Sequence, residues 1–187
     1  YNRLSDHDAQ AMVAYLRTIP AVGNVVARIT GLRLPKLEAP PPSGHGPPPG
    51  DPVTEGEYLA SLMVCVDCHT PMAADGSPDT AMQYAGGFPF RIPPPLGTGT
   101  VWSSNITPDR ETGIGRYSEE QIIAAMTKME KADGSPIRGP MTLFQSAWSK
   151  LEPDDAVAIA RFLKSLTPIN NPVPESLFEP APSPEKQ

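Results

Sequence analysis

The stretch Cys65-Val66-Asp67-Cys68-His69 decides what this chain folds around. Thiols at positions 65 and 68 lie on one helical turn and can add to the two vinyl groups of a single haem. The histidine that follows them then lies under the iron. The motif therefore predicts one covalent haem c, attached through Cys65 and Cys68, with His69 as the proximal iron ligand.

Other uses of two cysteines fit this sequence less well. A thioredoxin-like redox pair is expected after a strand in a βαβ unit, whereas a capped helix is predicted before Cys65. A zinc site needs four ligands, and outside the motif the chain offers only His7 and His45. A structural disulfide alone would not require the adjacent histidine. Covalent haem is the favoured interpretation.

The sixth ligand of the iron determines what such a haem can do, and seven methionines are available to supply it. A haem with one histidine and one methionine ligand has a raised potential that suits electron transfer. Met141 follows Gly139-Pro140 in a loop and is the favoured ligand, while Met82 in an earlier loop remains open. Met126 and Met129 fit the buried face of a predicted helix instead.

Helical patterns are confined to proline-free windows, because 25 of the 187 residues are proline. Helices are predicted over 5–19, 54–64, 118–131 and 153–166, with a short amphipathic segment up to 148, and capping boxes at Thr54–Glu57 and Ser118–Gln121. No strand pattern of useful length is found. The expected fold is mainly α, with long Gly/Pro-rich loops that pack on the haem.

The proline-rich segments also predict how the chain is organised. Residues 35–53 are predicted to be a linker, 54–168 the haem domain, and 169–187 a proline-rich tail that wraps a surface or is mobile.

An internal repeat concerns the first segment, 1–34. Residues 4–18 match residues 151–165 at a constant offset of 147, and Leu4, Asp8, Ala9, Ala11 and Leu16 recur as identical residues. Segment 1–34 is therefore predicted to be the terminal helix and extension of a preceding copy of the domain. The alternative is that two amphipathic helices look alike by chance.

The charge of the chain bears on its partners. A net charge of −6 disfavours nucleic acid, whose phosphates require basic surfaces. No apolar run approaches the roughly 20 residues of a membrane-spanning helix. Tyr1 opens into polar sequence without the pattern of a signal peptide, so an exported protein would here be processed or part of a longer chain.

The motifs around the haem site resemble class I c-type cytochromes, and most of all the cytochrome c domains of bacterial membrane-bound alcohol and gluconate dehydrogenases. The resemblance covers roughly 54–168. It rests on Gly56-x-Tyr58-Leu59, Cys65-x-x-Cys68-His69-Thr70, Gly86-Gly87, Ser104-Asn105-Ile106-Thr107-Pro108-Asp109, Thr112-Gly113-Ile114-Gly115, Pro140-Met141 and Asp155-x-x-Ala158-Ile159-x-x-Phe162-Leu163.

The resemblance implies a class I cytochrome c fold, a small helical bundle around one haem with crossing N- and C-terminal helices. Gly56 would allow their close approach, Phe162 would supply an aromatic contact, and Met141 would be the distal ligand. It further implies an exported, periplasmic electron carrier of a multi-haem or multi-subunit respiratory assembly, associated with the membrane through that complex. Its redox partners would be an upstream dehydrogenase or haem domain and a downstream carrier or oxidase.

Three further residues are candidates for the haem pocket: Trp102, Asn105 and Arg91, the last of which can pair with haem propionates. The alternative is that Trp102 and Asn105 are ordinary packing and turn residues.

Two other functions also remain open for the chain as a whole. One is a haem enzyme, peroxidase-like or sulfur-oxidising, with an open distal site. The other is a structural role in which the proline-rich linker and tail anchor other subunits.

Overall fold

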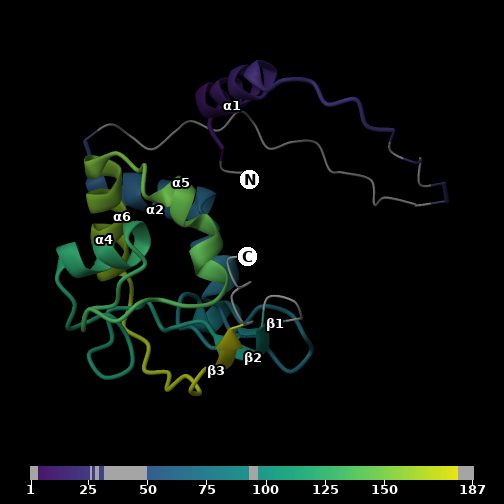
Figure 1. Cartoon of the computed structure of the whole chain (residues 1–187). Coiled ribbons are helices and arrows are strands. Elements are labelled where there is room, and N and C mark those ends of the chain that lie inside the picture. Colours follow the sequence, from purple (N-terminus) through teal and green to yellow (C-terminus); the bar gives the residue numbers. More distant parts are fainter. Residues whose placement is uncertain (1–3, 26, 28–29, 32–49, 93–96, 181–187) are drawn as a thin grey trace, which may run out of the picture. The chain divides into compact units, whose positions relative to one another are not determined.

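The computed structural model of the chain describes residues 4–25, 27, 30–31, 50–92 and 97–180 (Figure 1). The chain divides into two compact units, Tyr1–Pro48 and Pro49–Gln187, and each is described by itself. Among the described helices, none has both the length and the apolar character that crossing a membrane requires.

The described part of the first unit contains one helix, α1 (Asp6–Thr18), close to the predicted 5–19. The Ser5 hydroxyl accepts a hydrogen bond from the Asp8 N–H, and Arg17 lies in the last turn. This is the arrangement that helix termini favour. No residue of α1 is buried, so its large apolar side chains, Met12, Val13, Tyr15 and Leu16, lie at the surface.

The second unit contains most of the helices. They are α2 (Pro52–Leu62), α3 (Cys65–Cys68), α4 (Glu119–Thr127), α5 (Gln145–Trp148) and α6 (Pro153–Ser165), with the short 3₁₀ turns η1 (Thr80–Met82) and η2 (Pro140–Phe144). The capping box of Ser118 and Gln121 is confirmed at the start of α4.

Two predicted helix boundaries are wrong. The N-cap of α2 is Asp51, whose carboxylate accepts hydrogen bonds from Val53 and Thr54, so the expected capping box at Thr54–Glu57 does not begin this helix. Pro52 at the first helical position favours this earlier start. Helix α4 ends at Thr127 rather than near 131, since Met129 adopts a positive φ of 56°.

Helices α2 and α6 cross in backbone contact. A Cβ at Gly56 would lie 2.0 Å from the carbonyl oxygen of Ala158 and 2.8 Å from the Cβ of Phe162, so a larger residue cannot occupy this position. The Phe162 ring meets Tyr84 edge-on with centroids 5.8 Å apart. The close approach of Gly56 and the aromatic contact of Phe162, both implied by the resemblance, are therefore present.

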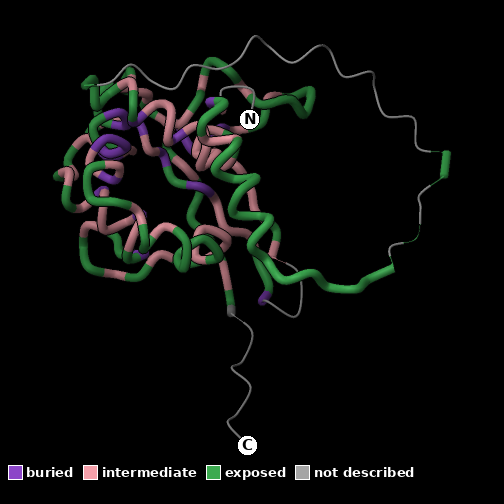
Figure 2. The backbone as a smooth tube through the Cα atoms, turned by 90° about the horizontal axis from the view of Figure 1, so that it is seen from above, coloured by how far each residue is buried: buried purple, intermediate pink, exposed green. Residues whose placement is uncertain are grey.

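The hydrophobic core of the second unit lies where α2, α4 and α6 meet, and Figure 2 shows the buried backbone gathered there. Its buried members are Ala60, Ile114, Ile122, Met126, Ile159, Ala160, Phe162 and Leu163. Side chains with partial exposure pack against this cluster, and among them are Cys65 and Met141. The core therefore supports both the attachment motif and the favoured ligand loop.

A small antiparallel sheet in the order β1-β2-β3 contradicts the prediction that the chain has no strands. It contains β1 (Pro89–Ile92), β2 (Gly97–Trp102) and β3 (Leu177–Pro180). A Cβ at Gly99 would lie 2.0 Å from the carbonyl oxygen of Leu177, so glycine is required where β3 approaches β2. Because Gly and Pro interrupt these short strands, no alternating apolar pattern was visible in the sequence.

Candidate haem site

The attachment motif is built on one short helical turn that follows α2. Val64 adopts a left-handed conformation, with φ 53° and ψ 32°, and thereby separates α3 from α2. The His69 N–H then donates a hydrogen bond to the Cys65 carbonyl at 3.0 Å, closing a single turn around both cysteines. A β-branched residue is rarely left-handed, so this turn is held by its surroundings.

Cys65 and Cys68 are not joined in a disulfide. Burial raises the pKa of the Cys65 thiol to about 12, with a further contribution from Cys68. Burial also raises the pKa of Cys68. Redox-active thiol pairs depend on a lowered pKa and a thiolate near neutral pH. The two thiols therefore lack the lowered pKa that a redox-active pair requires.

His69 is oriented by the backbone carbonyl of Ser104. Its Nδ1 lies 2.7 Å from that oxygen and donates the hydrogen bond, which leaves the lone pair of Nε2 for a metal. Burial lowers the pKa of His69, so the ring is neutral at pH 7. A neutral imidazole held by a second hydrogen bond is the usual form of a histidine that ligates a metal.

Gly86 and Gly87 position the Ser104 carbonyl. The Gly86 N–H donates to the His69 carbonyl at 2.7 Å, and the Gly87 N–H donates to the Ser103 carbonyl at 2.8 Å. At Gly86, with φ 75°, a Cβ would lie 2.4 Å from the carbonyl carbon of Ser104. Only glycine can therefore lie between the histidine and the backbone that orients it.

Asn105 is 3% exposed and forms the centre of a hydrogen-bond network. Its Nδ2 donates to the Thr112 hydroxyl at 3.0 Å and to the Ile169 carbonyl at 2.7 Å. Its Oδ1 accepts from the Thr107 N–H at 2.9 Å. Both amide hydrogens are used within the protein, so Asn105 acts here as a positioning residue beside Ser104. A direct contact with haem stays a prediction.

The chain after α6 packs on this same loop, a feature that sequence reasoning had left open. The Ile169 N–H donates to the Thr107 hydroxyl at 3.1 Å. The Asn171 N–H donates to the Thr112 hydroxyl, and its side chain donates to the Ala85 carbonyl, both at 2.9 Å. The described tail therefore wraps the loop that holds the histidine. The only sequence signal was a pair of asparagines among prolines, which is weak.

Met141 lies in η2, against the core cluster that Cys65 also contacts. Gly139 begins this turn with φ 86° and ψ −159°, a region that essentially only glycine adopts. A Cβ there would lie 2.9 Å from Cγ1 of Val101 in β2. The Thr142 N–H and hydroxyl both bond to the Gly139 carbonyl, at 3.1 and 2.8 Å. The sheet and this turn together position the methionine loop.

The other methionines differ in their surroundings. Met126 and Met129 are buried, as core packing predicts, and Met63 packs against the same cluster. Met12 lies in the first unit, and Met72 is 43% exposed. Met82 ends η1 and is partly exposed.

The three remaining candidate residues do not all line one hollow. Trp102 and Asn105 line a shallow hollow together with Ser104 and the tail segment 172–174. The Trp102 N–H donates to the Ser176 hydroxyl at 2.9 Å. Arg91 is exposed on β1, opposite Thr100 in the register. Its proposed pairing with a propionate stays a prediction.

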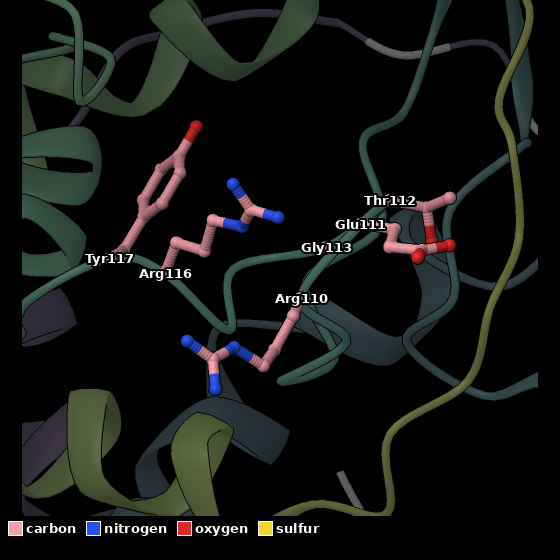
Figure 3. A pocket seen from close by; sticks show the side chains of 6 residues that line it. All are labelled: Arg110, Glu111, Thr112, Gly113, Arg116 and Tyr117. Carbon is pink, nitrogen blue, oxygen red and sulfur yellow. The ribbon is translucent and has the colours of Figure 1, made fainter.

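A second hollow contains cationic side chains that sequence reasoning missed. Figure 3 shows Arg110 and Arg116 extending from one loop segment, with Tyr117 beside Arg116. Neither guanidinium forms an ion pair with a carboxylate in the described part of the chain. Such an arrangement suits an anion. The available sequence signal was that both arginines flank the Thr112–Gly115 motif.

The donor set fits one haem c. Two protonated thiols and a neutral imidazole of fixed tautomer lie on one turn, and a methionine loop packs on the same core as that turn. Sulfur and imidazole ligands are those that haem iron takes in c-type cytochromes.

Several known proteins similar to this chain are cytochrome subunits of dehydrogenases. The chain is 37% identical over 118 residues to the cytochrome c subunit of alcohol dehydrogenase (quinone) from Gluconobacter oxydans, covering 63% of this chain and 22% of that protein. It is 30% identical over 148 residues to the fructose dehydrogenase cytochrome subunit of Gluconobacter japonicus, covering 79% and 27%. It is 33% identical over 118 residues to the gluconate 2-dehydrogenase cytochrome c subunit of Pantoea cypripedii, covering 63% and 24%.

No family model matches the chain. The resemblance to cytochrome c subunits of bacterial dehydrogenases that the motifs predicted is nevertheless confirmed, because the homologues carry those names. They imply a cytochrome c fold and a c-type haem. The chain spans about a quarter of the length of these relatives.

Proposed function

We propose that this chain transfers single electrons through one covalent haem c with His69 and Met141 as axial ligands. The observation that carries the proposal is the 2.7 Å hydrogen bond from His69 Nδ1 to the Ser104 carbonyl, beside two cysteines on the same turn. This bond fixes the ring orientation and would leave the Nε2 of the neutral ring free to bind the iron. The motif and its backbone support thus form a metal-ligating unit rather than a surface histidine.

When bound, the haem supplies the one-electron redox chemistry. The residues of this chain hold and tune it. Cys65 and Cys68 would attach it, and the Met141 thioether would complete the ligation and raise the potential. The apolar cluster beneath Cys65 and Met141 would exclude water from the iron. A closed distal side favours electron transfer over the binding of an exogenous ligand.

We further propose that the chain works as an electron-carrying part of a dehydrogenase complex in the periplasm, held at the membrane by that complex. The support is its likeness to cytochrome subunits of alcohol, fructose and gluconate dehydrogenases. It would accept electrons from a dehydrogenase subunit or a neighbouring haem and pass them to a downstream carrier or oxidase.

Met141 is preferred to the other methionines on the basis of position. Its turn is held by Gly139 against Val101, and its side chain is only partly buried, so the thioether is not enclosed by the core. Met126, by contrast, is 5% exposed on α4. The alternative ligand Met82 lies in η1, between the motif and Gly86.

The test is the optical and near-infrared spectrum of the oxidised and reduced protein. The parent protein is expected to be low-spin and to show the weak band of methionine–Fe(III) coordination. Met141→Ala is expected to lose this band and to bind carbon monoxide when reduced, while Met72→Ala and Met82→Ala keep the parent spectrum. Met72 is the matched control because it is exposed.

Two results would contradict the proposal. If Met82→Ala removes the band and Met141→Ala keeps it, the ligand assignment is wrong while electron transfer stands. If the parent protein is already high-spin or binds carbon monoxide readily, its distal site is open, and the haem-enzyme alternative becomes the better one.

A further inference from the structure

His69 is held by two loop segments that are separate in the sequence. The Gly86 N–H donates to the His69 carbonyl at 2.7 Å, and the Ser104 carbonyl accepts from Nδ1 of the ring at 2.7 Å. The place of the Ser104 oxygen relative to the first segment therefore sets the bond that orients the ring. A group that fixes the two segments relative to each other controls this bond without touching the histidine.

The two segments are joined directly on either side of the histidine contacts. The Ile106 N–H donates to the Tyr84 carbonyl at 2.9 Å, and the Gly87 N–H donates to the Ser103 carbonyl at 2.8 Å. In each segment two residues lie between these bonds, and one of the two is a partner of the histidine. The other residue of each pair is bonded to the chain that follows α6.

This third part of the chain is the described tail, residues 169–180. The Asn171 Nδ2 donates to the Ala85 carbonyl at 2.9 Å, and the Asn105 Nδ2 donates to the Ile169 carbonyl at 2.7 Å. Ala85 and Asn105 are the second residues of the two pairs, so each bond lies one residue from a partner of the histidine. Two tail residues thus bridge the two segments at the point where the ring is held.

Asn171 is fixed through its backbone as well as its side chain. Its N–H donates to the Thr112 hydroxyl at 2.9 Å, and the same hydroxyl accepts from Asn105 at 3.0 Å. Asn171 is half-buried, whereas its neighbour Asn170 is exposed and donates to two carboxylates of the loop at 3.3 and 3.4 Å. The two adjacent asparagines therefore hold different groups, and only Asn171 reaches the segment that contains Gly86.

The far end of the tail is fixed on the sheet. The Trp102 N–H donates to the Ser176 hydroxyl at 2.9 Å, and β3 pairs with β2 beyond this point. A Cβ at Gly97 would lie 2.6 Å from the ring of Phe178, so this side chain packs directly on the β2 backbone. The tail is anchored at both ends, which keeps residues 169–171 against the loop.

We propose that Asn171 is a positioning residue for His69, which keeps the Ser104 oxygen within hydrogen-bonding distance of Nδ1 by binding the neighbouring segment at Ala85. A hydrogen bond at Nδ1 raises the basicity of a ligating imidazole. A more basic imidazole stabilises Fe(III) relative to Fe(II), so the tail lowers the reduction potential of the haem. The inference rests on the proposed function, since it requires His69 as an iron ligand, but it does not depend on which residue is the distal ligand.

The test compares three variants of the haem-loaded protein with the parent. Asn171→Ala removes the bond to Ala85, and Asn171→Asp keeps the size of the side chain but has no hydrogen to donate. Asn170→Ala is the matched control, because it removes the adjacent asparagine from the same stretch of tail. If Asn171→Ala takes up no haem, Asn171→Gln, which displaces the amide by one methylene, is measured in its place with the same expected direction.

Two quantities are measured. The first is the rate at which the Nδ1 proton of His69 exchanges with solvent deuterium, observed by NMR in the reduced, low-spin protein. Carbon monoxide produces the same diamagnetic state if the distal site is open, so this measurement does not require Met141 as a ligand. The second is the reduction potential, obtained by spectroscopic titration. A change confined to overall stability would alter neither quantity in the folded protein.

Both Asn171 variants are expected to exchange the Nδ1 proton about tenfold faster than the parent, the effect of losing one hydrogen bond of ordinary strength. Their reduction potentials are expected to be higher than that of the parent, because the imidazole becomes less basic. Asn170→Ala is expected to match the parent in both quantities.

Three results would overturn the proposal while leaving the proposed function intact. Unchanged exchange and potential in both Asn171 variants show that the tail does not act on His69. Faster exchange with a lowered potential shows that the tail excludes water from the haem and does not strengthen the bond. Equal changes in Asn170→Ala show that the bond to Ala85 is not the cause. A parent protein without covalent haem would instead overturn the proposed function, and this inference with it.

Discussion

The proposed proximal and distal sides of the candidate haem site are constructed in different ways. On the proximal side three hydrogen bonds hold His69, through its N–H, its carbonyl and its Nδ1. On the distal side the hydrogen bonds that the structure describes for the Met141 turn are local, from Thr142 to Gly139 and from the Gln145 N–H to the Thr142 carbonyl, and the turn also packs on the core. Leu143, two residues on, is 71% exposed.

This difference indicates how much backbone displacement each side of the site can tolerate. The proximal side is held by directional backbone bonds that join segments far apart in the sequence, so a small displacement breaks several contacts together. The distal side is held by packing and by one glycine in an unusual conformation, so it can shift without unfolding the unit. The comparison can be tested at four positions, described from the largest expected effect to the smallest.

Replacement of the proximal ligand is expected to have the largest effect. His69→Ala should abolish the low-spin spectrum and most of the covalently attached haem, because both the ligand and its hydrogen bond to Ser104 are lost. His7→Ala is the control, since His7 is 91% exposed in the first unit. Haem content by the pyridine spectrum is the measurement. Retention of a low-spin haem in His69→Ala would show that another residue is the proximal ligand.

Gly86→Ala should destabilise the proximal side by about 2 kcal/mol or more. A left-handed alanine costs roughly 1–2 kcal/mol, and its Cβ would also lie 2.4 Å from the Ser104 backbone. Gly76→Ala is a matched control, with φ 83° but no atom within 4 Å of the added Cβ. Denaturant unfolding of the two variants measures the difference. If the two variants lose the same free energy of unfolding, the close approach of Gly86 to Ser104 does not contribute to stability.

Gly139→Ala should act on the distal side with a smaller effect on stability, roughly 1–3 kcal/mol, because the backbone conformation is nearly restricted to glycine. The main expected change is a weaker methionine–iron band and faster carbon monoxide binding. Gly134→Ala is the control, since its φ is 80° and the nearest atom to the added Cβ is 3.9 Å away. A large loss of stability with an unchanged band would contradict the distinction between the two sides.

The smallest effect is expected from Asp109, a partly exposed residue in the loop after Ser104. Hydrogen bonds from Thr112, with others from Glu111 and Asn170, hold the pKa of Asp109 below its ordinary value. Because the pKa of Asp109 is lower in the folded state than in the unfolded state, the ionised carboxylate stabilises the folded protein. This stabilisation is complete above the unfolded-state pKa of about 3.9 and is lost as the pH falls through the folded-state pKa. Asp109→Asn should therefore show a slightly weaker fall of Tm on acidification below about pH 4. An identical Tm–pH profile would show that the carboxylate does not support the loop.

Much of the helical framework could be predicted from the sequence. The cap at Ser5, the capping box at Ser118 and the start of α6 at Pro153 are local signals, read from residues within one turn. The prediction for α2 failed because Asp51-Pro52 is a competing start signal only three residues before Thr54. The strands were missed because β2 and β3 lie about 75 positions apart and contain glycine and proline.

The sequence by itself determined the chemistry of the site, because Cys65, Cys68 and His69 lie within one helical turn and need no distant partner to come together. It also determined the resemblance to cytochrome c subunits that the relatives confirm. Only the tertiary structure decided which carbonyl orients His69, and that both amide hydrogens of Asn105 are used within the protein. The bonds from His69 to Ser104 and from Asn105 to Ile169 join residues 35 and 64 positions apart, so they depend on how the loops pack and not on any local pattern.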